Sequence, residues 1–98
     1  MFTAIWEYEV AEHDRPEFER VYAATGAWAQ LFRHAAGYLE SILLRDVAQP
    51  GHYVTFDRWQ SRLAYDAFLA LESAAYAALD EQTRSLTIAE RELGVIEE

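Results

Sequence analysis

The chain has 98 residues, a length that suits one domain, and we expect that domain to span residues 1–98. With 17 acidic and 8 basic residues its net charge is −9, which argues against binding to nucleic acid or to an anionic membrane. The absence of cysteine excludes disulfides and thiolate metal sites, and the absence of a long apolar run or signal-peptide pattern leads us to expect a cytoplasmic protein.

The N-terminal third predicts a strand followed by a helix. Apolar and polar side chains alternate over residues 2–10, which is typical of a strand. Asp14 and Glu17 have the spacing of a capping box, with a proline between them that suits the first turn of a helix. Apolar residues then recur at helical spacing as far as Phe32, and we expect Gly26 to weaken or kink this helix in its middle.

The middle of the chain predicts an antiparallel hairpin. Its two strands are residues 38–46 and 52–59, and the connection VAQPG contains the Pro-Gly pair of a turn. Ser61 is positioned to cap a second helix, which we expect to end near Ser85. The last strand is predicted over residues 87–96, where charged residues suit the edge of a sheet.

These elements occur in the order β-α-β-β-α-β. This order predicts an α+β, ferredoxin-like fold, in which a four-stranded antiparallel sheet has both helices on one face. Side chains on both faces of the sheet are apolar, so the face away from the helices also needs a cover. We therefore expect a homodimer in which the sheets of two subunits pack face to face.

The third strand indicates a candidate pocket. Thr55, Asp57 and Trp59 share one strand face with Tyr53. If this face lies against the helices, a hydroxyl and a carboxyl group are buried, which costs on the order of 1–3 kcal/mol for the hydroxyl unless it is paired or opens onto a cavity. Either this face is the wall of a pocket, or Asp57 pairs with an arginine and Trp59 fills a sealed core.

Aromatic residues on the two predicted helices are candidates for the same pocket. Tyr22 and Trp28 belong to the first helix, and Tyr65, Phe68 and Tyr76 to the second. Aromatic residues at helical spacing occur in closed cores as well as in ligand sites. They therefore either complete the core or form a slot for a flat ligand.

The remaining polar residues predict neither a metal site nor hydrolase chemistry. No two of the histidines His13, His34 and His52 have a metal-ligand spacing, and each is interpreted as solvated. His34, near the end of the first helix, is nevertheless a candidate acid or base at the mouth of a pocket. No serine lies in a nucleophile-elbow context and no glycine-rich phosphate loop occurs.

Four consecutive segments carry a resemblance to a known family. GYLESILLRD, a proline-containing turn, YVTFDRWQS and AYDAF follow one another as in the antibiotic biosynthesis monooxygenase family of the dimeric α/β-barrel superfamily, and the chain resembles that family over essentially its whole length. The resemblance implies a homodimer whose sheets form a barrel, with a pocket between sheet and helices in each subunit. Members include oxygenases that convert polycyclic phenols to quinones without metal or flavin, and others that degrade haem.

The resemblance also implies catalytic residues. The quinone-forming members use a tryptophan at this strand end, a polar residue four positions earlier and a tyrosine six positions later, and these positions hold Trp59, Thr55 and Tyr65. The polar residue is typically asparagine, and this chain contains no asparagine. The haem-degrading members need an asparagine, a tryptophan and a histidine on the second helix, and this chain has no asparagine and no histidine between residues 53 and 98.

The sequence thus predicts a cofactor-independent oxygenase that binds a small aromatic ligand. A phenol or anthrone is expected to lie against Trp59, with Thr55 and Tyr65 hydrogen-bonded to its oxygens and His34 as the base. Further contacts with the substrate are expected from Tyr22, Trp28, Asp57, Phe68 and Tyr76. The alternatives are a non-catalytic module that binds a small hydrophobic molecule and a purely structural dimer with a filled interior.

Overall fold

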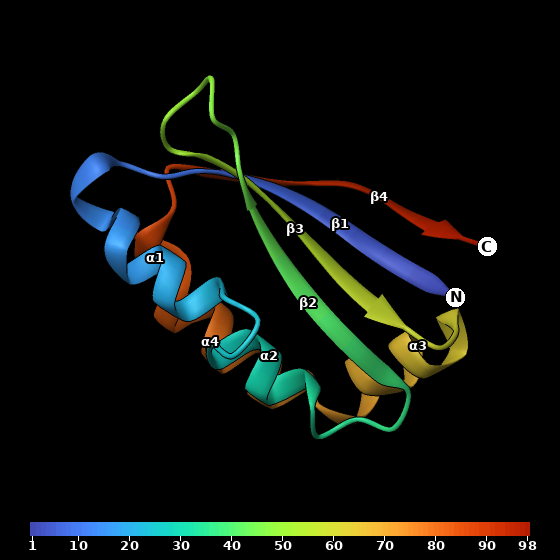
Figure 1. Cartoon of the computed structure of the whole chain (residues 1–98). Coiled ribbons are helices and arrows are strands. Elements are labelled where there is room, and N and C mark those ends of the chain that lie inside the picture. Colours follow the sequence, from blue (N-terminus) through green and yellow to red (C-terminus); the bar gives the residue numbers. More distant parts are fainter.

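A four-stranded antiparallel sheet with helices on one face forms the protein in the computed structural model, which describes residues 1–98 (Figure 1). The strands lie side by side in the order β2-β3-β1-β4. Their bounds are β1 Phe2–Glu9, β2 Tyr38–Arg45, β3 His52–Trp59 and β4 Ala89–Glu97. The α-helices are α1 Arg15–Tyr22, α2 Ala27–Phe32, α3 Arg62–Leu71 and α4 Ser73–Thr83, and the short 3-10 helices are η1 Glu12–Asp14 and η2 Arg84–Leu86. The ferredoxin-like α+β fold predicted from the sequence is confirmed.

Each of the two predicted helices is interrupted. The first ends at Tyr22 and restarts at Ala27, because a Cβ atom at Gly26 would lie 2.2 Å from the carbonyl oxygen of Val21 and only glycine allows this close approach. The second changes direction at Glu72, which has non-helical dihedral angles (φ −111°, ψ 24°) between α3 and α4.

One of the two predicted helix caps is confirmed. Ser61 has an extended backbone, and its Oγ accepts a hydrogen bond from the backbone N–H of Ala64 at 3.1 Å. The capping box at Asp14 was wrong, since the side chain of Asp14 makes no capping hydrogen bond. The reason is that Asp14 already has helical dihedral angles as the last residue of η1, whereas a capping residue has an extended backbone.

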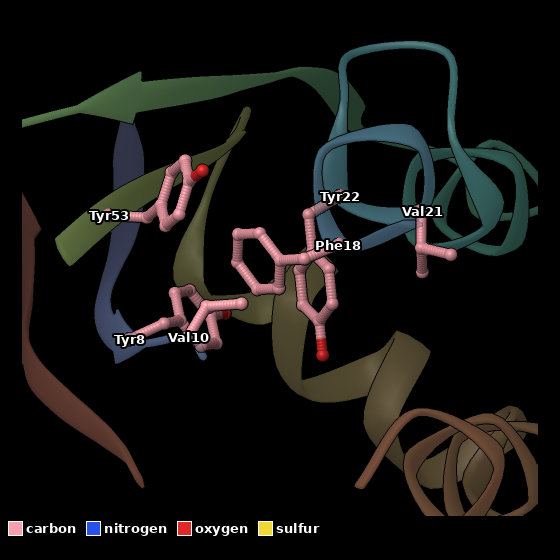
Figure 2. Packing of buried hydrophobic residues seen from close by; sticks show 6 residues of the cluster. All are labelled: Tyr8, Val10, Phe18, Val21, Tyr22 and Tyr53. Carbon is pink, nitrogen blue, oxygen red and sulfur yellow. The ribbon is translucent and has the colours of Figure 1, made fainter. Parts of the chain in front are cut away.

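The core consists of two clusters between sheet and helices. The first is formed by Tyr8, Val10, Phe18, Val21, Tyr22 and Tyr53, and Figure 2 shows these side chains converging from β1 and the residue after it, from β3 and from α1. Within it the rings of Phe18 and Tyr22 stack with centroids 4.2 Å apart. The second is formed by Phe2, Phe32, Trp59 and Phe68, so β1 and β3 contribute to both clusters.

The two faces of the sheet differ in what covers them. The face toward the helices holds the buried Tyr53, Thr55 and Trp59, which confirms that these residues share one face of β3 as predicted. The other face, which no element of the chain covers (Figure 1), presents an apolar set. Its members are Ile5, Ile42, Leu44, Val54, Phe56 and Ile96. None of the helices has the length and apolar character needed to cross a membrane.

Candidate functional site

A cavity of about 230 Å³ lies between the sheet and the helices, where the two core clusters meet. Strands β1, β2, β3 and β4 form one side of the cavity, and helices α1, α2 and α4 form the other. Its lining residues are Trp6, Tyr8, Tyr22, Trp28, Ala29, Phe32, Ser41, Thr55, Asp57, Tyr76, Asp80 and Glu90. Aromatic walls with a few convergent polar groups are typical of sites for small flat molecules.

Five of the residues singled out from the sequence line this cavity. They are Tyr22, Trp28, Thr55, Asp57 and Tyr76. The structure thus brings together residues from α1, α2, β3 and α4 that are far apart in the chain. Asp57 forms no ion pair with any arginine, so the arginine-paired interpretation of this carboxylate was wrong.

Three others lie beside the cavity, in or against the second core cluster. Trp59 has no exposed surface, and its ring packs 5.3–5.6 Å from the rings of its aromatic neighbours. Phe68 is one of these neighbours, and Tyr65 lies between Phe2 and Trp59, with centroid distances of 5.2 and 5.5 Å. Phe32 of α2 and Phe68 of α3 close over Trp59, so β3 borders the cavity at Thr55 and Asp57 but enters the closed core at Trp59.

His34 lies outside the cavity. It is exposed just after α2, which places its imidazole away from the lining residues. His52 differs from the solvated histidine expected, because Nε2 lies 3.1 Å from Glu7 and Nδ1 lies 3.1 Å from Asp46. These carboxylates, with Glu7 the larger effect, raise the pKa of His52. The structure contains no group of three or more His, Asp or Glu side chains arranged to hold a metal ion.

A chain of hydrogen bonds ends at the carboxylate of Asp57. The hydroxyl of Ser41 donates to Oδ1 of Asp57 at 2.8 Å, and the hydroxyl of Tyr38 lies 2.7 Å from Oγ of Ser41. Ser41 stands directly opposite Asp57 in the β2–β3 pairing, which explains the contact. Burial raises the pKa of Asp57 to about 6, and the hydrogen bond from Ser41 opposes this rise only in part.

Thr55 and Trp28 add further polar atoms to the lining of the cavity. Oγ1 of Thr55 lies 3.2 Å from the hydroxyl of Tyr8, whose pKa is raised by burial so that it stays a neutral phenol. Nε1 of Trp28 is buried and has no partner with hydrogen-bond geometry. A buried donor without a partner is costly, so a ligand oxygen placed there would satisfy it.

Acidic side chains also surround the cavity where α4 approaches β4. Partial burial raises the pKa of Glu90, and the negative charge of Asp80 acts in the same direction. Arg84 lies outside the lining and contacts Asp80 at 3.8 Å. The lining therefore holds three carboxyl groups and no cationic side chain, which disfavours an anionic ligand.

Sequence reasoning missed several lining residues. Trp6 and Tyr8 belong to the buried face of β1 that the alternation already indicated, so they could have been included. Ser41 could have been found from the hairpin, because a turn centred on Gln49 aligns Ser41 with Asp57. Asp80 and Glu90 had no such signal, since they come together only through the packing of α4 near β4.

Comparisons with known proteins agree with this architecture. The family model for antibiotic biosynthesis monooxygenases matches residues 1–80. No curated protein sequence matches the chain. Among solved structures, SnoaB, a cofactor-independent oxygenase from Streptomyces nogalater, is similar with a TM-score of 0.75 and 24% identity, over 99% of this chain and 91% of that one.

Two further structures show the same fold. MhuD from Mycobacterium tuberculosis, a heme degrader whose structure has two hemes bound in its active site, is 24% identical with a TM-score of 0.72, over 100% of this chain and 95% of that one. A Deinococcus radiodurans protein assigned to the antibiotic biosynthesis monooxygenases is 19% identical with a TM-score of 0.76, over 100% and 92%. At these identities the likeness establishes the fold and leaves the reaction open.

Proposed function

This chain belongs to the antibiotic biosynthesis monooxygenase family, and from that premise we propose that its cavity binds a small aromatic molecule and that the protein oxidises it with dioxygen. The observation that carries the proposal is the cavity itself, with aromatic walls and a few polar atoms directed inward. Its volume of about 230 Å³ lies below the roughly 300–1,000 Å³ of pockets for drug-sized ligands. A molecule of two or three fused rings is therefore the preferred substrate class.

The proposed reaction converts a fused-ring phenol or anthrone to a quinone. The substrate loses two hydrogen atoms and gains one oxygen atom from dioxygen, and the second oxygen atom leaves as water. Dioxygen is thus the oxidant, and the protein has to bind the substrate, orient it and stabilise its anion. We propose that no metal or flavin takes part, by analogy with SnoaB, which is a cofactor-independent oxygenase.

The proposed roles follow from the position of each side chain. Thr55, held by Tyr8, and the free Nε1 of Trp28 would hydrogen-bond the oxygens of the substrate. Tyr22 and Tyr76 would contact its rings. Trp59 and Tyr65, which do not line the cavity, would act as positioning residues. The aromatic cluster around Trp59 fixes Phe32, which is part of the cavity wall. His34 is not among the lining residues, so we do not propose it as the base.

Haem degradation is not proposed for this chain. MhuD shares the fold, and haem iron in proteins is most often held by histidine, cysteine or methionine. The cavity lining contains none of these three residue types.

Oxygen uptake tests the proposed oxidation. We expect uptake well above the rate of autoxidation when the protein is supplied with anthrones and hydroquinones and no metal or flavin is added. Thr55→Val should reduce turnover by roughly 10-fold or more, because it removes one hydrogen bond from the site. Thr25→Val, an exposed position outside the cavity, is the matched control and should leave the rate unchanged.

A non-catalytic binding module is the second candidate. The favouring observation is the absence of asparagine from the chain, which leaves threonine where the quinone-forming members typically have an amide. In this case members of the same panel should raise the melting temperature of the protein without any uptake of oxygen. Tyr76→Phe would then change the affinity for the ligand alone, whereas catalysis would also change turnover. If no ligand shifts the melting temperature, the site is not a binding site.

The uncovered face of the sheet supports a homodimer as the functional form. The apolar set Ile5, Ile42, Leu44, Val54, Phe56 and Ile96 faces away from the helices, and a second copy of the chain would cover it. Phe56→Asp should convert a dimer to a monomer in analytical ultracentrifugation. A wild-type protein that is monomeric at micromolar concentration would exclude this arrangement.

A further inference from the structure

We propose that Asp57 accepts the proton of a hydroxyl group on the bound aromatic molecule, and that Ser41 and Tyr38 position its carboxylate for this step. The inference rests on the proposed function in that it concerns the same cavity. It goes further by assigning the proton acceptor and by requiring that the ligand carry a hydroxyl group.

The first argument is geometric. Asp57 lines the cavity, and its Oδ1 accepts the only proton of the Ser41 hydroxyl at 2.8 Å. Because the Ser41 hydroxyl already donates its proton to Asp57, the hydroxyl of Tyr38, 2.7 Å away, must donate to Ser41. Tyr38 therefore fixes the direction of the Ser41 hydroxyl, and Ser41 holds the carboxylate in one orientation. Oδ2 accepts no hydrogen bond from the protein and is free for a ligand.

The second argument concerns the groups that surround Asp57. From β2 it faces Ser41 and Tyr38. Besides Tyr38, the phenols within its electrostatic reach are Tyr8 of β1, Tyr65 of α3 and Tyr76 of α4, whose pKa values are raised chiefly by burial and also by the charge of Asp57. Asp80 and Glu90 line the same cavity. No arginine or histidine lines the cavity to neutralise the carboxylate.

The consequence is a carboxylate suited to act as a base. Without a cation, and partly buried, Asp57 has a pKa of about 6, so it is ionised at neutral pH yet binds a proton more readily than an exposed aspartate. In the proposed step the O–H bond of the ligand breaks and its electron pair stays on the ligand oxygen. The proton forms an O–H bond to Oδ2 of Asp57. The resulting phenolate is the electron-rich species that reacts with dioxygen.

The other ionisable groups of the lining are less suited to this role. Asp80 lies close to Arg84, and the carboxylate of Glu90, on the edge strand β4, has no hydrogen bond that fixes it. The tyrosines of the lining have raised pKa values, so they are neutral and lack a vacant site for a proton at neutral pH. Asp57 is the one carboxylate that a neighbouring hydroxyl of the lining fixes in place.

Ligand binding tests the inference without relying on turnover. The probe is 2-naphthol, and 2-methoxynaphthalene is the matched compound without a hydroxyl proton. A hydrogen bond to a carboxylate is roughly twice as strong as one to its neutral acid, so the affinity for naphthol should rise about tenfold between about pH 5 and about pH 8. The affinity for methoxynaphthalene should stay constant, and Asp57→Asn should remove the pH dependence for naphthol.

Variants of the neighbouring serine separate positioning from simple packing. Ser41→Ala removes the hydrogen bond that lowers the pKa of Asp57, so the midpoint of the naphthol titration should move to higher pH. Ser41→Thr keeps a hydroxyl and should restore the midpoint. Asp66→Asn, an exposed position on α3, is the control and should bind as the wild type does.

Steady-state oxygen uptake distinguishes this inference from the proposed function. If both hold, kcat/KM should fall below about pH 6, and Asp57→Asn should lower it by roughly 10²-fold or more. Uptake that is the same in Asp57→Asn overturns the inference and leaves the oxygenase standing. No uptake by the wild type, together with pH-dependent naphthol binding that Asp57→Asn abolishes, overturns the oxygenase and supports the acceptor role. Naphthol binding that does not depend on pH overturns the inference in every case.

Discussion

Replacing Asp57 with asparagine should make the folded protein more stable at neutral pH. The carboxylate is partly buried and has no cationic partner, and its only hydrogen bond comes from Ser41. Asparagine has nearly the same shape, and its side-chain oxygen can still accept the hydrogen bond from Ser41. The substitution therefore removes a poorly solvated charge and leaves the packing in place.

The size of the effect follows from the raised pKa of Asp57. Its rise from 3.8 to about 6 is about two pKa units, which correspond to about 3 kcal/mol of unfavourable interaction in the ionised folded state. Solvent in the cavity screens the charge, so we expect a gain of roughly 1–2 kcal/mol for Asp57→Asn. Well below pH 4 the group is protonated in both states and has no effect. The penalty develops as the pH rises from about 4 to about 6, and it is complete above that window.

Urea unfolding of both proteins at equal concentration measures this effect. The difference in unfolding free energy between Asp57→Asn and the wild type should be small at about pH 4 and reach its full value at about pH 7. Asp66→Asn, at an exposed position, should stay within about 0.5 kcal/mol of the wild type at neutral pH. A variant that is less stable than the wild type at pH 7, or a difference that does not change with pH, would refute the reasoning.

Three further predictions concern the elements around the site. Ser61→Ala should lower the unfolding free energy by about 1 kcal/mol in urea titrations, because the N–H of Ala64 loses its cap. Gly37→Ala should destabilise by roughly 1–3 kcal/mol in the same assay, since Gly37 has φ +92° and an added Cβ would lie 2.6 Å from the Cβ of Ala64. His52→Gln should lower the stability of the protein at about pH 6 and progressively less toward pH 8. Glu7, more than Asp46, raises the pKa of His52 in the folded state. The stabilisation from His52 is therefore complete below the unfolded-state pKa of about 6.5 and is lost as the pH rises through the folded-state pKa. Melting temperatures across that range measure this loss.

The fold could be predicted because its signals are local. The two-residue period of β1 identified its buried face, and the Pro50-Gly51 turn located the hairpin. The same turn determines which residues of β2 and β3 pair, so the contact between Ser41 and Asp57 was available from the sequence. These features could be predicted because they depend on the backbone geometry of a strand or a turn and not on contacts with distant residues.

The boundary between cavity and core could not be predicted in the same way. The two-residue alternation of a strand places Thr55, Asp57 and Trp59 on one face, but it does not show where along β3 the helices come close. In the structure, Phe32 and Phe68 reach Trp59 from two helices and close the core there. Thr55 and Asp57, earlier in β3, line the cavity instead. The break at Glu72, after which α4 lies over the cavity, could not be predicted because no glycine or proline marks it in the sequence.

The arrangement around Asp57 makes sense as a compromise between stability and chemistry. A position that served only the core would be more stable with an apolar side chain, which would also reduce the cavity. Here the position holds a carboxylate without a cation, which accepts a hydrogen bond from Ser41, whose hydroxyl is in turn bonded to that of Tyr38. An arginine beside Asp57 would recover the lost stability, but it would lower the pKa of the carboxylate and weaken it as a base. The feature that costs the folded state free energy is thus the same feature that fits Asp57 to remove a proton from a ligand.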